Sequence, residues 1–174
     1  MYRLCLGLAL SLLTCVSIHG QTGNPYFNVM DPAYGAKCDG STDDTTAFQN
    51  ALNAANAHGG TVFVPNTSSG SQCVIKGTLN MDSFNEVTLT GPQGLYANMY
   101  RGFPELVFTS NPTGNIYISA HSSRALTFQN IMIDYENTSF NGKVIDLSGG
   151  SLATFRNMTV MGDGLAVNAA CSLF

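Results

Sequence analysis

Three aspartates close together are the first candidates for chemistry in this sequence. Asp39, Asp43 and Asp44 lie within one glycine-punctuated stretch. Such carboxylates can serve as general acid and base or bind a metal ion. They can equally mark the start of a helix, because a carboxylate is stabilised near a helix N-terminus. We favour the structural interpretation, since it is sufficient, and we expect neither a metal ion nor a cofactor.

A second pair of acids is separated by 27 residues. Glu136 and Asp163 would lie on adjacent turns of a structure that repeats with this period. Two carboxyl groups about 5–5.5 Å apart suit a retaining glycosidase, and a wider spacing suits an inverting one. The alternative is two solvated loop acids, which is the ordinary state of Asp and Glu. A glycan on the neighbouring Asn137 would obstruct a polysaccharide at this place.

Two further features are candidates for binding. Tyr96, Tyr100 and Arg101 belong to an aromatic and basic loop that could stack on sugar rings or pack against the body of the protein. His121 follows a small residue at a predicted turn. A lone histidine in a turn is expected to be solvated rather than catalytic.

One helix is predicted immediately after the three aspartates. Thr42 is its expected N-cap, with Asp43 and Asp44 in the first turn and Gly59-Gly60 as the stop signal. The residues that recur at helical spacing on one face are Ala47, Phe48, Ala51, Leu52 and Ala55.

After Gly60 the pattern changes to short β-type segments separated by Gly, Asn, Ser or Pro. Strands without intervening helices exclude a doubly wound α/β fold and leave a sandwich, a barrel or a β-solenoid. The predicted strands are Thr61–Val64, Cys73–Ile75, Glu86–Thr90, Glu105–Thr109, Asn115–Ser119, Ala125–Phe128, Ile131–Tyr135, Lys143–Leu147, Leu152–Phe155 and Met158–Met161.

An internal repeat favours the solenoid. Residues 126–133 resemble residues 153–160 at an offset of 27, and the upstream segments match to within one residue. A period in the twenties made of strands and turns is typical of stacked coils. We expect Phe128 to stack over Phe155 inside, and Asn130 over Asn157 at a turn, about 4.8 Å apart. A sandwich with a coincidental match remains the alternative.

Residues Tyr34–Leu79, with YGAKCDGSTDDTTAFQNAL followed by GGTVFVP, resemble the N-terminal signature of the pectate lyase-like right-handed β-helix superfamily. That superfamily includes polygalacturonases, rhamnogalacturonases and exo-β-1,3-glucanases. The resemblance implies an all-β, right-handed parallel β-helix with an N-terminal capping α-helix. The cap would span about 31–60 and the coils would run from about 61 onward. The helix would then cover the open end of the solenoid, which otherwise exposes strand edges, and the aspartates would serve the turn and the start of that helix.

The first twenty residues predict secretion. Arg3 precedes an apolar run that is shorter than the roughly 20 residues needed to span a bilayer, so residues 1–20 are interpreted as a signal peptide and 21–174 as the domain. A retained signal anchor is the alternative. The chain has 7 Lys+Arg and 11 Asp+Glu. This acidic balance argues against nucleic acid as a partner, and no membrane contact is expected after cleavage.

The cysteines and sequons agree with an oxidising compartment. Cys38 and Cys73 are a candidate disulfide, and Cys171 is left without a partner. The candidate glycosylation sites are Asn66, Asn137 and Asn157.

From the resemblance, we expect a secreted protein that acts on extracellular polysaccharide. A glycosidase of the polygalacturonase or rhamnogalacturonase type is the leading prediction. An exo-β-1,3-glucanase-like enzyme and a non-catalytic carbohydrate-binding or adhesive solenoid are the alternatives. Because the family's catalytic motifs are missing, we expect the chain to be the N-terminal part of such a protein, with most catalytic residues beyond Phe174.

Overall fold

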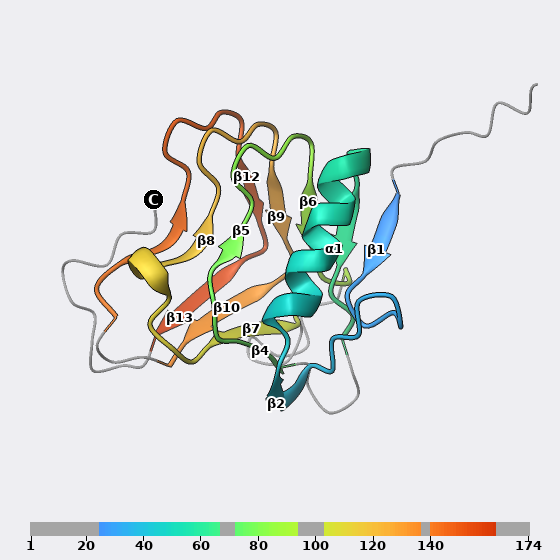
Figure 1. The fold of residues 1–174 in the computed structure, drawn as a ribbon, viewed down its shortest axis with the longest axis vertical. Coiled ribbons are helices and arrows are strands. Elements are labelled where there is room, and N and C mark those ends of the chain that lie inside the picture. The colour runs from blue at the N-terminus through green and yellow to red at the C-terminus, as the bar shows by residue number, and fades with distance from the viewer. Residues whose placement is uncertain (1–24, 67–71, 94–102, 137–139, 163–174) are drawn as a thin grey trace, which may run out of the picture.

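The computed structural model describes residues 25–66, 72–93, 103–136 and 140–162 (Figure 1). Short strands dominate these ranges, with one α-helix and one 3-10 turn. The elements are β1 (Tyr26–Asn28), β2 (Asp39–Asp43), α1 (Thr45–His58), β3 (Thr61–Phe63), β4 (Gln72–Ile75), β5 (Leu79–Asn80), β6 (Thr88–Thr90), β7 (Glu105–Phe108), η1 (Thr113–Asn115), β8 (Ile116–Ser119), β9 (Thr127–Gln129), β10 (Met132–Tyr135), β11 (Lys143–Asp146), β12 (Thr154–Arg156) and β13 (Thr159–Gly162).

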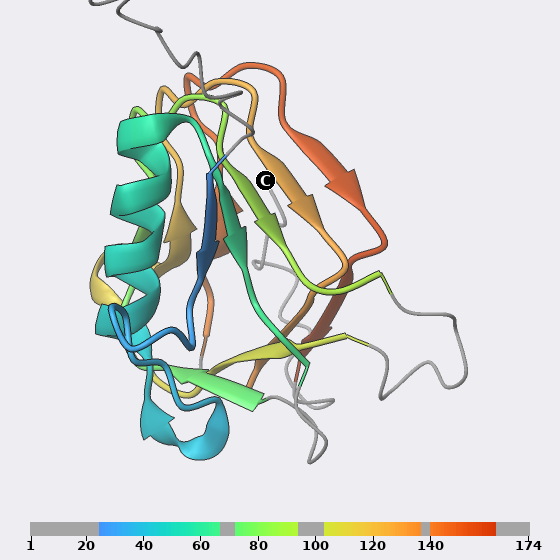
Figure 2. The same ribbon diagram turned by 90° about the vertical axis from the view of Figure 1, so that its right-hand side faces the viewer.

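The strands form three sheets in which every pair is parallel. Sheet A has the order β1-β3-β6-β9-β12, sheet B has β2-β4-β7-β10-β13, and sheet C has β5-β8-β11. Figure 2 shows the strands of sheet A side by side, from β1 in blue to β12 in orange-red. Successive strands of the chain visit sheets A, B and C in turn, except that in the first circuit α1 follows β2 in place of a sheet C strand.

This topology is mostly β with parallel strands and one helix, and it is consistent with a parallel β-helix. β-Sandwiches are built from antiparallel sheets, so the parallel pairing does not fit the sandwich alternative. Neighbouring coils are offset by 27 residues where Thr127 pairs with Thr154, and by 39 where Thr88 pairs with Thr127. No helix in the described ranges has the length and apolar character of a membrane span.

The core consists of inward side chains stacked from coil to coil. In sheet A, Val62 pairs with Leu89, Leu89 with Phe128, and Phe128 with Phe155. The rings of Phe128 and Phe155 are stacked, with centroids 5.3 Å apart and planes 8° from parallel. This confirms the predicted phenylalanine ladder. The side chains of Val62, Leu89 and Phe128 are fully buried.

The predicted asparagine pair is confirmed at the tight turn between sheets A and B. Asn157 Nδ2 donates to Asn130 Oδ1 at 3.1 Å. Both residues have a positive φ, 54° at Asn130 and 48° at Asn157, a conformation that asparagine tolerates better than most residues. The turn is therefore built the same way on two consecutive coils.

Helix α1 takes the place that a sheet C strand would occupy in the first coil. It follows β2, lies beside β5 (Figure 1), and contacts β1, β3 and β5. Its buried residues are the five that the spacing predicted: Ala47, Phe48, Ala51, Leu52 and Ala55. Burying Phe48 and Leu52 contributes about 1.5–3 kcal/mol each. The helix ends at Gly59, whose φ of 64° is left-handed, as the stop signal predicted.

The predicted start of the helix is wrong. Thr42 is not the N-cap, and the first helical turn contains no acidic residue. Residues 39–43 instead form β2 beside β4, and Asp44 is the N-cap residue without a capping bond from its side chain. The Asp44 N–H donates to the Val74 carbonyl at 2.8 Å, so pairing with the second coil keeps this segment extended up to the helix.

Three strands escaped the sequence analysis. β1 and β2 precede the helix and pair with β3 and β4, so strand pairing begins before the cap helix. β5 has two residues and pairs with β8. The ten predicted strands are present, with ends that differ by one or two residues.

Candidate functional site

Sheet C presents a polar surface on its outward side. Leu79, Ile118 and Ile145 pair across the sheet and point into the core. The next residues, Ser119 and Asp146, therefore point outward, because successive side chains of a strand alternate.

The ladder continues past the ends of the strands, with Ser83 N donating to His121 O and Ser122 N to Ser148 O. The next outward row is therefore formed by Asp82, His121 and Ser148. Lys143 joins these residues because its Nζ contacts Asp146 Oδ2. We call the set of six the polar face: Asp82, Ser119, His121, Lys143, Asp146 and Ser148.

His121 lies at the centre of the polar face and contacts the coil on either side. Its Nε2 lies 2.9 Å from Asp146 Oδ2, and its Nδ1 lies 3.5 Å from Asp82 Oδ1. Its backbone N–H also donates to Asp82 Oδ1 at 2.8 Å. The hydrogen bond with Asp146, together with the charges of both aspartates, raises the pKa of His121 although partial burial opposes the shift. Its side chain is 41% exposed, so a ligand can reach it.

Asp146 is the buried carboxylate of the polar face and binds several of its other members. Its side chain is only 6% exposed. Lys143 Nζ donates to its Oδ2 at 3.0 Å, and the Ser148 backbone N–H and hydroxyl donate to its Oδ1. Burial raises the pKa of Asp146, but the bonds from Ser148, His121 and Lys143 outweigh it and hold the pKa well below its usual range. Asp146 is therefore ionised and fixes the orientation of the His121 ring and the Lys143 ammonium group.

Asp82 is the more accessible carboxylate, with 38% of its side chain exposed. Ser119 Oγ donates to its Oδ1 at 2.7 Å. Burial raises the pKa of Asp82, but the bonds from Ser119 and His121 lower it by more, so the pKa lies below its usual value. Within the described residues, the hydrogen bonds and the ion pair of this carboxylate all reach Oδ1.

Ser119, His121 and Asp146 have the connectivity of a Ser-His-Asp triad, since Ser119 Oγ lies 3.3 Å from His121 Nδ1. The geometry does not support a nucleophilic serine. The Ser119 hydroxyl donates its proton to Asp82, and Ser119 is 7% exposed. The group has the chemistry of an acid–base and hydrogen-bonding surface.

A second group of carboxylates lies on sheet B. Burial raises the pKa of Glu105, and a hydrogen bond with Asp134 and the charges of Asp134 and Glu136 add to the shift, against the bond from Gln72. Gln72 Nε2 donates to Glu105 Oε2 at 2.9 Å. Glu136 is exposed, but Asp163 lies outside the described residues, so the predicted Glu136–Asp163 pair remains a prediction.

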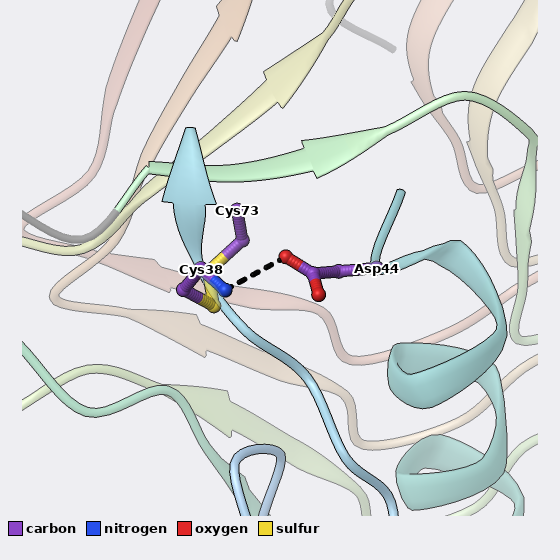
Figure 3. Close-up of side chains that lie close together, drawn as sticks. All are labelled: Cys38, Asp44 and Cys73. Atoms are coloured by element: carbon purple, nitrogen blue, oxygen red, sulfur yellow. Dashed lines mark hydrogen bonds between the residues drawn. A yellow bond between two sulfur atoms is a disulfide. The ribbon is translucent and has the colours of Figure 1, made fainter. Parts of the chain in front are cut away.

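The predicted disulfide between Cys38 and Cys73 is confirmed (Figure 3). It joins the residue before β2 to β4, and both cysteines are buried. Asp44 lies beside it: its carboxylate accepts the N–H of Lys37 at 2.7 Å and of Cys38 at 2.9 Å. Burial, with help from Asp39 and Asp43, raises the pKa of Asp44 against these two bonds. The ligand atoms of Cys38, Asp44 and Cys73 lie within 4.8 Å of one another, but disulfide sulfurs are not thiolate ligands.

The other two aspartates of the cluster have local structural bonds. Asp39 Oδ1 accepts the backbone N–H of Ser41 and Thr42, and these bonds lower the pKa of Asp39. Asp43 Oδ1 accepts the N–H and hydroxyl of Thr45. These contacts support the structural interpretation of all three aspartates, although they act before the helix rather than in its first turn.

The remaining predicted residues have different outcomes. Asn66 and Asn157 are exposed, and the side-chain nitrogen of Asn157 donates to Asn130. The residues that lie outside the described ranges are Tyr96, Tyr100, Arg101, Asn137 and Cys171.

A hollow of about 200 Å³ lies at the corner between sheets C and A. No charged side chain lines it; its walls are Ser123, Leu126, Leu147, Gly150, Ser151, Leu152 and Ala153. It offers apolar contact but no acid or base.

Sequence reasoning noticed His121 but missed its partners. Asp82 lies 39 residues before His121, because the coil between them is longer than the 27-residue repeat. The sequence repeat aligns the upstream segments only to within one residue, whereas the structure pairs Ile118 with Ile145 and Ser119 with Asp146. With that register, an outward aspartate beside His121 would have been visible.

Comparisons with known proteins agree with this fold. A comparison with curated proteins found no match. Among solved structures, ORF18 of Geobacillus virus E2 is similar, with a TM-score of 0.56 and 21% identity over 76% of this chain. The match covers 25% of that structure's chain, so this chain spans about a quarter of its length, and the likeness shows the fold alone. Residues 26–68 match the family described as rhamnogalacturonase A/epimerase, pectate lyase-like, which confirms the resemblance first drawn from Tyr34–Leu79.

Proposed function

We propose that this chain is the front part of a secreted right-handed parallel β-helix that acts on extracellular polysaccharide. A glycosidase of the polygalacturonase or rhamnogalacturonase type is the leading activity. The family match over residues 26–68 and the three parallel sheets support the scaffold. Because one fold hosts many functions, the activity must be argued from the site.

The polar face carries the proposal. Sugars present hydroxyl groups at regular intervals, and they bind to carboxylates, amides and cations held in fixed positions. Asp82, His121 and Lys143 meet this requirement, since each is about 40% exposed and each is held by a hydrogen bond or ion pair. Two carboxylates on either side of a histidine also provide groups that can give or take a proton during glycoside cleavage.

Secretion is part of the same proposal. The Cys38–Cys73 disulfide suits an oxidising compartment, where such bonds persist. Residues 1–20 have the pattern of a signal peptide.

One observation favours a neutral glycan over a polyuronate. The polar face has two aspartates, one lysine and one histidine, so its charge is negative when His121 is neutral. A negative face repels a polyanion. This repulsion supports the alternative of an exo-β-1,3-glucanase-like enzyme. If the polar face binds a glycan without cleaving it, the alternative of a carbohydrate-binding or adhesive solenoid is favoured.

The test compares three glycans with the purified chain. Polygalacturonate, rhamnogalacturonan and laminarin are each assayed for reducing-sugar release, for unsaturated products and for binding by affinity electrophoresis. Asp82→Asn should weaken whichever response is found, whereas Asp31→Asn removes an exposed charge on the cap and should not. The absence of binding and turnover with all three glycans, or equal behaviour of the two variants, would sink the proposal.

A further inference from the structure

The protonation state of His121 determines how many groups donate hydrogen bonds to the Asp82 carboxylate. Both ring nitrogens face acceptors: Nε2 faces Asp146, and Nδ1 faces Asp82 Oδ1 and Ser119 Oγ. An imidazolium can donate from both nitrogens, whereas a neutral ring donates from one and accepts at the other. The contact with buried Asp146 is the shorter, so the neutral ring keeps its proton on Nε2 and Nδ1 becomes an acceptor.

The Ser119 hydroxyl responds to this change. It has two acceptors within reach once the ring is neutral, Asp82 Oδ1 at 2.7 Å and His121 Nδ1 at 3.3 Å. While the ring is protonated, Asp82 is its only acceptor among these groups. Loss of one proton from His121 therefore removes the Nδ1–H contact from Asp82 and allows the serine to turn away as well.

We propose that His121 is a proton-operated latch on Asp82. With the imidazolium present, Asp82 is held by His121 and Ser119. With the neutral ring, Asp82 keeps the backbone N–H of His121 and can accept hydroxyl groups of a ligand. The ligand part of this inference rests on the proposed function, whereas the latch itself does not.

The surroundings of His121 shift its transition to higher pH. The charged groups that face the ring are Asp82 on the preceding coil and Asp146 on the following coil, with Lys143 paired to Asp146. The hydrogen bond with Asp146 and the charges of both aspartates raise the pKa of His121, so its proton leaves at a higher pH than is usual for histidine. The closed latch is present below that pKa and is lost as pH rises through it.

Reciprocity gives a second consequence. If proton loss at His121 strengthens a ligand's contact with Asp82, then a ligand bound to Asp82 must lower the pKa of His121. The coupling is between two partly exposed side chains, so it is modest. We expect a neutral laminarin oligosaccharide to bind about two- to fivefold more tightly at pH 9 than at pH 5.

The latch is tested first without a ligand. Nuclear magnetic resonance of the full chain follows the His121 ring proton and the Asp82 carboxyl carbon from pH 4 to pH 10. The expected result is a second inflection of the Asp82 signal at the pKa of His121. Asp82→Asn should lower the pKa of His121, while Asp31→Asn should leave it unchanged. Equal His121 titrations in the wild type and Asp82→Asn, or no second inflection, would overturn the latch.

Laminarin oligosaccharide is then titrated at pH 5 and pH 9. The affinity ratio should fall in Ser119→Ala, which keeps both aspartates and the histidine but lacks the hydroxyl that changes partner. Binding with the same affinity at both pH values would overturn the control of the ligand by His121. If the resonance data show the latch but laminarin and polygalacturonate bind at neither pH, the proposed function fails while the latch stands.

Discussion

Gln49 of α1 and Asn80 of β5 exchange two hydrogen bonds. Gln49 Nε2 donates to the Asn80 carbonyl at 2.7 Å, and the Asn80 N–H donates to Gln49 Oε1 at 2.8 Å. One turn earlier, Thr45 Oγ1 accepts the N–H of Lys76 at 2.8 Å. Helix side chains thus satisfy the strand edge that a preceding coil would otherwise pair, which is the problem that a solenoid cap must solve.

Gln49→Ala is predicted to lower the free energy of unfolding by about 1–2 kcal/mol, because it leaves the edge groups of Asn80 without their protein partner. Urea denaturation followed by circular dichroism measures the change. Asn50→Ala, at the adjacent exposed position, is the control for truncation to alanine in this helix; it gains somewhat more helix propensity than Gln49→Ala, because asparagine is a poorer helix former than glutamine. Equal midpoints for the two variants would contradict the role of Gln49.

Breaking the Cys38–Cys73 disulfide is predicted to cost about 4 kcal/mol, because the bridge closes a loop with a sequence separation of 35. The double variant Cys38→Ala/Cys73→Ala should unfold at a lower urea concentration than the oxidised wild type. Reductant should destabilise the wild type and leave the double variant unchanged. If the thiols of the wild type become titratable but its urea midpoint does not change, the disulfide contributes nothing to stability.

Asp44→Asn is predicted to cost about 1–3 kcal/mol. The carboxylate accepts one N–H on each oxygen, from Lys37 and Cys38, whereas an amide has only one acceptor and leaves a buried donor unpaired. Asp43→Asn is the matched control, because Asp43 uses a single oxygen for Thr45 and an amide retains it. Thermal unfolding of both variants distinguishes the two aspartates, and a greater loss in Asp43→Asn would refute the assignment.

The two rings of the phenylalanine ladder should differ in their contribution. Phe128→Ala is predicted to cost about 3–5 kcal/mol, because Phe128 is fully buried and truncation leaves a cavity. Phe155→Ala should cost clearly less, since Phe155 is half-buried. Phe128→Leu, which restores much of the volume, should recover part of the loss. Chemical denaturation gives all three values, and the reverse order would contradict the stacking.

Glu105 should give stability a pH dependence. Its pKa is raised in the folded state, so the native protein binds the proton more tightly than the unfolded chain does. The contribution of Glu105 to stability is then greatest below the usual pKa of Glu, about 4.3, and is lost as pH rises through the folded pKa.

Glu105→Gln keeps the acceptor for Gln72 and removes this effect. It should stabilise the protein by less than about 1 kcal/mol at pH 7, since solvent screens the partly exposed group, and should match the wild type at pH 3.5. Urea midpoints at both pH values measure the difference. Glu86→Gln, an exposed change of the same charge, is the control. If Glu105→Gln is less stable than the wild type at pH 7, the predicted direction of the effect is wrong.

Local patterns predicted the parts of the fold that depend on local physics. The buried face of α1, its glycine stop and the Phe128–Phe155 stack follow from periodicity, and the structure confirms each. β2 has the sequence DGSTD, with no alternation of apolar residues, and it is held by backbone pairing with β4. No propensity rule could reveal a strand that depends on a partner some 33 residues away.

The polar face was harder to predict for a different reason. It joins residues from three coils, and one of those coils has an offset of 39 instead of 27. A single period therefore aligned His121 with Ser148 but could not bring Asp82 beside it. The chemistry depends on the insertion length, which a pattern of hydrophobic residues does not encode.

The connection from sheet C to sheet A has the same length on the three described coils that contain a sheet C strand: Leu89 follows Leu79, Phe128 follows Ile118 and Phe155 follows Ile145 by ten positions each. Its left-handed positions also recur, at Ser83, Ser122 and Gly149 and at Glu86, Ala125 and Leu152. The other two connections vary in length. Natural and engineered insertions are therefore best tolerated in the connections on either side of sheet B. Duplicating a 27-residue segment whose ends lie within sheet B would keep each connection from sheet C to sheet A intact and add one coil to the protein.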